Sequence, residues 1–272
     1  MAVAHLFEQR PADADGRRAA LAAAVARLAG DGPDRAPDQA FDAPDGRAAI
    51  ALPEPLAALV PGGVRRGEAL ALSGATVDYL SLALLAAALR QGLWCAAVGA
   101  AGLGGAALTG LLGAAAVRAG ALRRLLVVAE PGEHWAEVAA MLADGVDLLL
   151  VCPPEAVTAQ TARRVDARLR QGVADAARHR AALLVLGSWP SARAVLRVRR
   201  LGWTGLAAGT GHLAGGRAEI TAEDRARRVR SVRVWLPAPD GAVSPATASA
   251  GRAPEVREEA TAAGARRLTA VA

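Results

Sequence analysis

The stretch that decides the fold is Glu68-Ala-Leu-Ala-Leu-Ser-Gly-Ala-Thr-Val-Asp-Tyr-Leu80. Its apolar run over residues 69–72 predicts a buried strand, and the apolar segment 77–91 predicts a long helix. A strand, a short turn that contains glycine and a helix occur in this order around a phosphate-binding loop. The segment therefore predicts an α/β fold with a turn at the position of such a loop.

The turn lacks the residues that bind phosphate. A phosphate-binding loop reads G-x-x-x-x-G-K-[ST]: its backbone N–H groups and lysine hold phosphate, and its hydroxyl holds magnesium. Here Gly74 remains, but the chain contains no lysine, and no arginine stands in its place. Asp78 would repel phosphate. We interpret as a degenerate nucleotide loop the residues Ser73, Gly74, Ala75, Thr76, Val77 and Asp78.

Length and composition indicate one medium-sized domain with tails. The 272 residues are 53% hydrophobic but only 3% aromatic, so aliphatic side chains must build the core. The net charge of +6 indicates anionic partners or a solvated arginine surface. Because no C-x-x-C motif is present, Cys95 and Cys152 are expected to be free buried thiols in a reducing cytosol, with no metal site.

Neither the N-terminus nor the longest uncharged stretch predicts a membrane protein. Residues 1–18 are too polar for a signal peptide. Residues 91–117 are long enough to span a bilayer, but the small-residue turn 99–105 divides them into a strand and a helix. We therefore expect a cytoplasmic protein without membrane contact.

Changes in composition divide the chain into three parts. Residues 1–48 contain an alanine-rich helix at 17–28 and a flexible linker, and residues 49–237 form the core. Residues 238–272, rich in Pro, Ser, Ala and Thr, are expected to be mostly disordered, with a short helix at 256–268.

Apolar strands alternate with helices through most of the core. After the strand at 69–72, the predicted strands are 93–98, 124–129, 146–151 and 182–186, separated by helices at 103–119, 133–144 and 158–180. Nearly continuous apolar strands are typical of a parallel sheet buried on both faces. The pattern then changes to strands with little helix, at 195–203, 205–221 and 229–236, which predicts an antiparallel extension.

Two groups of motifs carry a resemblance to a known family. Leu56-x-x-Leu59-Val60-Pro-Gly-Gly-Val-x-Arg-Gly-Glu68 resembles the segment that leads into the core of RecA-type ATPases. Trp203-x-Gly205-Leu206, Gly209-x-Gly211-His212-Leu213 and Val232-x-Val234-Trp235-Leu236-Pro237 resemble actinobacterial ImuA-like proteins, which are encoded beside a Y-family polymerase homologue. The resemblance covers residues 49–237 and implies a RecA-like core with a mostly parallel central sheet, flanking helices and an antiparallel C-terminal extension.

The resemblance also implies where ATPase residues should stand, and they are missing. The acidic residue that binds magnesium should follow the fourth strand, where Cys152 stands instead. The catalytic glutamate should follow the second strand, but the turn 99–102 contains no acid, and only Ser188 lies near the γ-phosphate sensor position. These losses predict a pseudo-ATPase without enzymatic activity or cofactor.

A loose dinucleotide motif competes with this interpretation. Gly102-Leu-Gly104-Gly-Ala-Ala107 opens a predicted helix, and Glu130 ends the next strand, where it could meet a ribose. Residues 99–101 intervene between the strand and the motif, so a small-residue turn is favoured in this glycine-rich chain.

Arginine clusters are the candidate DNA contacts. In a RecA fold, the loops after the central strands face DNA, and arginine binds phosphate and stacks on bases. The candidate cluster consists of Arg193, Arg197, Arg199 and Arg200, with Trp203 close by. A solvated surface is equally compatible with it, and is favoured for the second cluster, at 225–233, which is predicted to form a hairpin turn.

The resemblance implies a non-catalytic accessory role in DNA-damage tolerance, within SOS mutagenesis and translesion synthesis. Its partners would be an ImuB-like Y-family polymerase homologue, RecA, an error-prone C-family polymerase with the β clamp, and single-stranded DNA. The segments 17–28 and 256–268 are candidates for docking on such partners. The alternatives are a SulA-like inhibitor that binds the tubulin-like division protein and an enzyme that uses a nucleotide cofactor.

Overall fold

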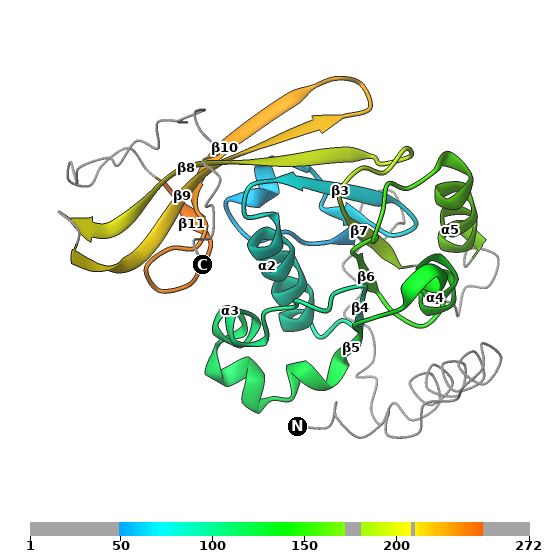
Figure 1. Cartoon of the computed structure of the whole chain (residues 1–272), viewed down its shortest axis with the longest axis horizontal. Helices are drawn as coiled ribbons and strands as arrows, with labels where there is room; N and C mark the ends of the chain where they lie inside the picture. The colour runs from blue at the N-terminus through cyan, green and yellow to red at the C-terminus, as the bar shows by residue number, and fades with distance from the viewer. Residues whose placement is uncertain (1–48, 172–180, 208–209, 247–272) are drawn as a thin grey trace, which may run out of the picture.

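The computed structural model describes residues 49–171, 181–207 and 210–246 (Figure 1). Within them, nine strands form one sheet in the order β11-β10-β9-β8-β3-β7-β6-β4-β5. A separate two-stranded sheet pairs β1 (Ala49–Ile50) with β2 (Val64–Arg65). The predicted helix at 17–28 and segment at 256–268 lie outside the described residues.

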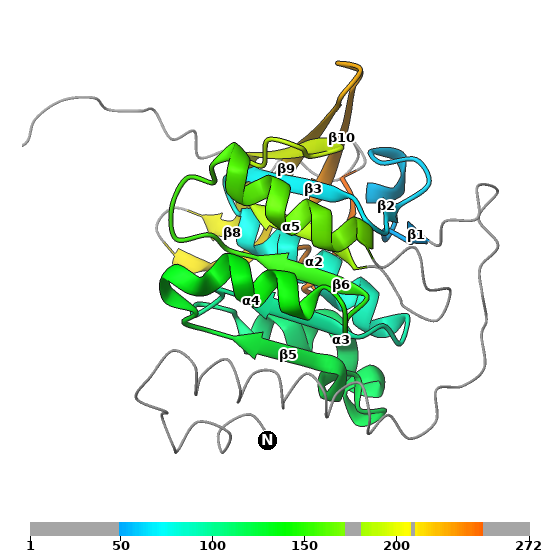
Figure 2. The same cartoon turned by 90° about the vertical axis from the view of Figure 1, so that its right-hand side faces the viewer.

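The parallel part of the sheet confirms the α/β prediction. Its strands are β3 (Ala69–Gly74), β4 (Cys95–Val98), β5 (Leu125–Val128), β6 (Leu148–Val151) and β7 (Ala182–Leu186). Four helices connect and cover them: α2 (Val77–Arg90), α3 (Gly105–Arg118), α4 (Trp135–Leu142) and α5 (Ala159–Gln171). Figures 1 and 2 show α2 and α3 on one face and α4 and α5 on the other. Short 3-10 turns occupy Leu56–Ala58, Ala121–Arg124 and Gly132–His134.

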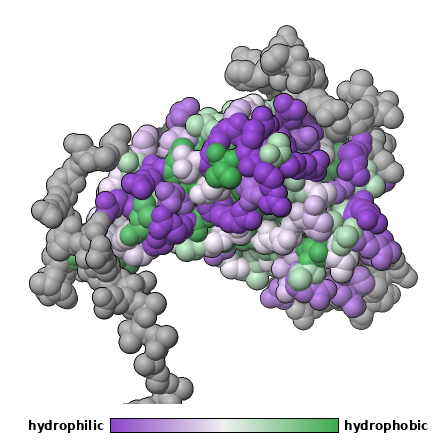
Figure 3. Space-filling model, turned by 90° about the horizontal axis from the view of Figure 1, so that it is seen from above, coloured by the Kyte–Doolittle hydropathy of each residue, from purple (hydrophilic) through white to green (hydrophobic). Residues whose placement is uncertain are grey.

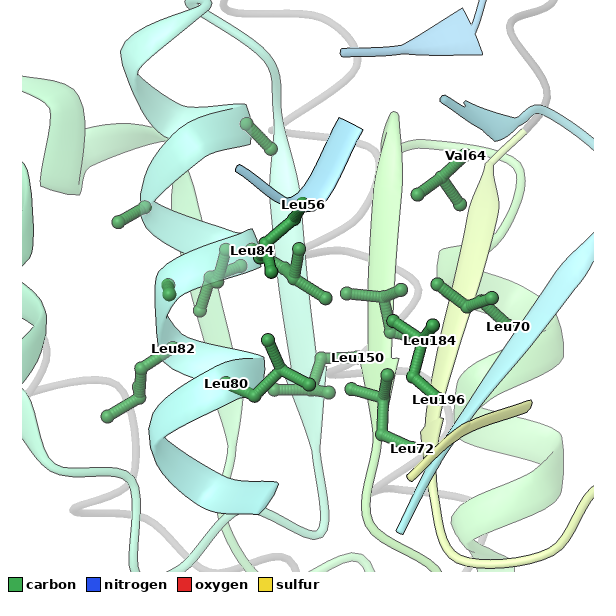
Figure 4. Packing of buried hydrophobic residues seen from close by; sticks show 14 of the residues in the cluster. Leu56, Val64, Leu70, Leu72, Leu80, Leu82, Leu84, Leu150, Leu184 and Leu196 are labelled. Atoms are coloured by element: carbon green, nitrogen blue, oxygen red, sulfur yellow. The ribbon is translucent and has the colours of Figure 1, made fainter. Parts of the chain in front are cut away.

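Burial on both faces explains why the strands are apolar throughout. Successive side chains of a strand point to opposite faces. Leu72, Leu150 and Leu184 therefore belong to the core beside α2, which Figure 4 shows at close range. Their neighbours Val151 and Val185 belong to a second core, beneath α4 and α5. With helices on both sides, no position in these strands can be polar without a partner.

One buried ion pair fastens the parallel strands to the segment before β3. The side chain of Asp147, which precedes β6, is 10% exposed, and its Oδ1 accepts a hydrogen bond from Arg66 Nη1 at 2.8 Å. The backbone N–H of Trp94, just before β4, donates to Asp147 Oδ2 at 2.7 Å. Each carboxylate oxygen is therefore satisfied, as a buried charge requires.

The described extension consists of four strands, and the first of them also pairs with the parallel sheet. Its strands are β8 (Ala194–Ala207), β9 (Thr210–Asp224), β10 (Val229–Trp235) and β11 (Ser244–Pro245). The first part of β8 pairs parallel with β3, so only β9 and the strands after it are antiparallel to their neighbours. The strand predicted at 205–221 starts at Thr210 instead, because residues up to Ala207 continue β8.

The described fold also continues past Pro237, the predicted end of the core. Ala238 is buried at 5% exposure, and the Ala246 N–H donates to Arg233 O at 3.0 Å. Between them, β11 pairs with the end of β10. The first residues of the predicted tail are therefore part of the sheet.

Candidate functional site: the β3–α2 turn and the arginine-rich extension

The turn at the nucleotide-loop position is too short to surround a phosphate. β3 ends at Gly74 and α2 begins at Val77, so only Ala75 and Thr76 connect them. The Ala75 N–H donates to Val198 O of β8 at 2.9 Å, so it is already occupied by a protein partner. A phosphate-binding loop needs a longer run whose N–H groups remain free for the ligand. This turn is joined to β8 instead.

The conformation of the turn depends on Gly74. Its φ of +99° lies in the region that favours glycine, and a Cβ there would lie 2.2 Å from Val198 O. Thr76 also has a positive φ, of 56°, which is strained for a β-branched residue. Its Oγ1 donates to Ala75 O at 2.6 Å, so the hydroxyl binds its own turn. The turn is thus bonded to itself and to β8, and the interpretation of residues 73–78 as a degenerate nucleotide loop stays a prediction.

A loop from the extension packs against the first turn of α2. The Tyr79 hydroxyl donates a hydrogen bond to Gly241 O, 162 residues further along the chain. Burial, and to a smaller extent the charge of Asp240, raises the pKa of Tyr79. Val243 also packs partly against the main core. The helix end that would face a nucleotide therefore faces a neighbouring loop of the same chain.

Cys152 occupies the predicted magnesium position, directly after β6. Its N–H donates to Val98 O at 2.8 Å, and a Cβ on Gly99 would lie 2.3 Å from Cys152 O. Burial, and secondarily the charge of Asp78, raises the pKa of Cys152 to about 11. A thiol is a poor substitute for a carboxylate here, because magnesium is bound through oxygen ligands. Both cysteines are free, and Cys95 is buried.

The four predicted DNA-contact arginines do not form one patch. Arg197 and Arg199 lie on the sheet face away from α2, because Leu196 and Val198 beside them point into the core next to that helix. Arg193 lies at the start of β8, where it forms an ion pair with Glu68 at 3.4 Å. The structure therefore gathers only two of the four on one open face.

Arg200 lies on the opposite face. Its Cζ lies 4.0 Å from the centroid of the Trp203 ring, and its Nη1 and Nη2 are buried without a hydrogen-bond partner. Burial lowers the pKa of Arg200. The sequence contained a signal for this difference: successive residues of a strand point to opposite faces, so residue 200 lies on the other face from residues 197 and 199.

Carboxylates of β9 neutralise part of the open face. Glu219 lies between Arg199, at 2.5 Å, and Arg233 of β10, at 3.6 Å. Glu223 contacts Arg197 at 2.9 Å and Arg227 at 2.5 Å. Hydrogen bonds from Arg199 and from Arg227 are the main causes that hold the pKa values of these glutamates below their usual range. Arginines and carboxylates thus alternate across this face, and Figure 3 shows its hydrophilic surface.

Comparisons with solved structures identify the fold. Many chains match, among them the RadB recombinase, with a TM-score of 0.53 at 14% identity over 71% of this chain and 97% of that one. The chain has a RecA-like fold. The sequence model of one protein family, described as the MT3502 N-terminal domain, matches residues 58–191. No curated protein matches.

Within the RecA-like fold, the competing dinucleotide motif has no structural need for its glycines. The motif glycines Gly102 and Gly104 precede α3. A Cβ on Gly102 would meet nothing within 4 Å, and one on Gly104 would make only ordinary contacts, at 3.6 Å from Ala107 and Leu82. Neither residue has a positive φ. In a dinucleotide site the glycines permit a tight turn and a close backbone approach. The small-residue turn favoured by the sequence describes this segment better.

The second arginine cluster forms a hairpin turn, as the sequence predicted. Asp224 ends β9 and Val229 begins β10, and the residues between them include three arginines. Asp224 Oδ2 accepts a hydrogen bond from Arg228 at 2.8 Å, and Arg225 donates to Ser191 O. The first bond stabilises the turn itself, and the second joins the turn to the segment between β7 and β8.

Two further observations limit the chemistry of the described residues. No group of three His, Cys, Asp or Glu side chains in residues 49–171, 181–207 and 210–246 is arranged to hold a metal ion. None of the helices in the same ranges is both long and apolar enough to cross a bilayer. The stretch 91–117 instead contains β4 and most of α3, which the sequence predicted.

Proposed function

We propose that this chain is a non-catalytic RecA-like protein that acts by binding partners in DNA-damage tolerance. The β3–α2 turn carries the proposal: two residues connect strand and helix, and the Ala75 N–H is bound to Val198 O. Phosphoryl transfer depends on positioned phosphate and magnesium ligands. Here lysine is absent from the chain, and Cys152 stands where the magnesium carboxylate is expected.

The partner we propose is an ImuB-like Y-family polymerase homologue in translesion synthesis, with RecA and an error-prone C-family polymerase as further partners. The motifs around Trp203, Gly211 and Trp235 support this assignment through their resemblance to ImuA-like proteins. The RecA-like fold, which the chain shares with the RadB recombinase, is the further support for a role beside DNA repair enzymes.

A SulA-like inhibitor of cell division is the second candidate. It too would use a RecA-like core without ATPase residues, and an acidic or apolar patch that dominates the interaction surface would favour it. The exposed Trp203, Leu206 and Leu213 favour it. Tagged chain purified from DNA-damaged cells separates the two candidates: an ImuB-like partner supports the first, and the tubulin-like division protein supports the second.

Calorimetric titration with Mg-ATP tests the absence of catalysis. We expect no heat of binding and no phosphate release, because the turn offers neither a cradle nor a cation ligand. A RecA protein measured in the same buffer is the positive control. Micromolar binding, with turnover abolished by Thr76→Ala, would contradict the proposal, since it would require an intact phosphate site at this turn.

A further inference from the structure

The outer end of the β8–β9 pair is an uncharged apolar hairpin. We define the apolar hairpin as the strand segments 201–206 and 211–216, which contain no Asp, Glu, Lys or Arg. Among the described residues, the exposed large hydrophobic side chains are Leu201, Trp203, Leu206, Leu213 and Val229, and all but Val229 belong to it. Concentrated exposed apolar surface of this kind marks an interaction site. Figure 1 shows the hairpin projecting beyond the end of β3.

One edge of this hairpin is open. β8 pairs with β3 only as far as Val198, and from Arg199 onward it pairs with β9 alone. No strand in the described part of the chain covers the other edge of β8 from Arg199 to Ala207. Unpaired backbone groups on an apolar edge strand are a template for a strand of another chain. Charged side chains and proline usually block such edges. Arg199 and Arg200 stand at the start of this edge, and residues 201–207 contain neither a charged residue nor proline.

Trp203 is a preformed anchor on the hairpin. Its ring lies on the Arg200 guanidinium, 4.0 Å from centroid to Cζ, and the residue is 43% exposed. Gly216, its partner on β9, leaves room for this arrangement, since a Cβ there would lie 2.1 Å from Arg200 Nη1. Tryptophan is enriched among the residues that dominate binding energy, and a ring fixed in advance loses little entropy on binding.

The surroundings of the hairpin are strongly basic. Residues 193–246 contain ten arginines and four carboxylates, whereas the other described residues contain ten of each. Arg199 and Arg233 lie near the base of the hairpin, with side chains 68% and 69% exposed. Ion pairs this exposed contribute little stability, so these arginines can exchange partners at small cost. The charge favours a partner that places carboxylates next to its apolar contact.

We propose that the apolar hairpin binds an extended segment of another protein along the open edge of β8. The segment carries apolar side chains at alternate positions, which contact Trp203 and Leu206, followed by carboxylates that reach Arg199. This inference rests on the proposed function, in which the chain acts by binding partners, and it names the surface and the chemistry of the partner segment.

Two other occupants fit the surface less well. A second copy of this chain would bring two extensions of equal positive charge together, and the repulsion would oppose pairing. A lipid bilayer would leave the unpaired backbone groups of the β8 edge without hydrogen bonds in the hydrocarbon region. A partner strand with apolar and acidic residues would balance the positive charge of the extension and would pair with the free backbone groups of the β8 edge.

Selection of a displayed random peptide library on the full-length chain tests the proposal. We expect enriched peptides to combine alternating apolar residues with a run of Asp or Glu. The double variant Leu206→Ser and Leu213→Ser should weaken their binding by about tenfold or more. Val229→Ser is the matched control, because Val229 is exposed but lies outside the hairpin, and it should change binding less than about twofold.

Two changes to the selected peptides test the mode of binding. Methylation of alternate backbone nitrogens should weaken binding by about tenfold, since it blocks strand pairing, and so should replacement of the carboxylates by lysine. Circular dichroism confirms that each protein variant is folded. Unchanged binding by the double variant, no enriched pattern, or no enrichment at all would overturn the inference.

Two further measurements identify the alternative occupants. Light scattering would reveal a dimer, and sedimentation with anionic phospholipid vesicles would reveal membrane binding; either one, if lost in the double variant, would also overturn the inference. None of these results bears on Mg-ATP turnover, which decides the proposed function separately.

Discussion

The parallel strands β3 to β7 and the extension from β8 to β11 belong to one sheet but use charge in different ways. Around the parallel strands the described residues carry as many carboxylates as arginines, and Asp147 is buried against Arg66. In residues 193–246 arginines outnumber carboxylates ten to four, and the ion pairs are exposed. Helices cover both faces of the first region, whereas the second leaves one face open.

This difference separates stability from recognition. Buried aliphatic side chains on both faces hold the parallel strands together, so changes there should cost most. The open face of the extension contributes little to stability, so its sequence is free to serve a partner. Four predictions compare matched changes in the two regions.

The largest effect is expected from a leucine truncation in the parallel sheet. Leu184 in β7 is fully buried between β3 and β6, so Leu184→Ala should reduce the free energy of unfolding by about 2–5 kcal/mol. Leu206→Ala on the apolar hairpin is the matched change at 45% exposure and should cost less than about 0.5 kcal/mol. Urea denaturation measures both, and similar losses would mean that the hairpin is part of the folding core.

The next effect compares two carboxylates. Asp147→Asn should cost about 3 kcal/mol, because it removes the charge of a buried carboxylate that accepts hydrogen bonds from Arg66 and Trp94. Glu219→Gln removes a carboxylate held between Arg199 and Arg233 in solvent, and should cost much less. Denaturation at low and high salt distinguishes the two, since only the exposed pairs are screened. A salt-sensitive loss at Asp147 would contradict its buried role.

A smaller effect is expected at the junction of the two regions. Gly74→Ala should cost about 2 kcal/mol, because φ is +99° there and the added Cβ would meet Val198 O. Gly105→Ala at the start of α3 is the control, since its Cβ would meet nothing within 4 Å, and it should be neutral or slightly stabilising. Thermal unfolding compares the pair; a tolerated Gly74→Ala would show that the turn can move away from β8.

The last prediction concerns binding and not stability. If the open face contacts single-stranded DNA, replacing Arg197 and Arg199 by Ala should weaken binding to an oligothymidine. The slope of log affinity against log salt should also fall by about 1.4, for two lost phosphate contacts. Arg200→Ala should have a smaller effect on the slope, because that guanidinium is buried against Trp203. No binding of the unmodified chain at low salt would show that these arginines are surface residues only.

Local sequence was sufficient to predict the parallel half. A strand buried on both faces must be apolar at every position, and glycine and proline mark its ends, so the strand predicted at 182–186 matches β7 residue for residue. Alternation with helices then predicts the parallel arrangement. The loss of the phosphate-binding residues at Gly74 could be seen in the same way.

The extension was predicted less well, because its geometry depends on contacts between distant residues. The parallel pairing of β8 with β3, the bond from Ala75 to Val198 and the contact of Tyr79 with Gly241 join segments more than a hundred residues apart. A register shift between Arg200 and Gly202 also changes the face on which the following side chains lie. None of these features has a local signature.

The bond between Ala75 and Val198 has a mechanical consequence. Val198 is the last residue of β8 that is paired to the parallel sheet, and the strand beyond it projects without support on that side. A partner that displaces the hairpin would therefore strain the contact between Val198 and Ala75 before any other contact of β8 with the parallel sheet. In a nucleotide hydrolase this turn binds phosphate, whereas here it holds the point where the hairpin leaves the sheet. The hydrogen-exchange rate of the Ala75 amide would therefore report strain that a bound partner places on the hairpin.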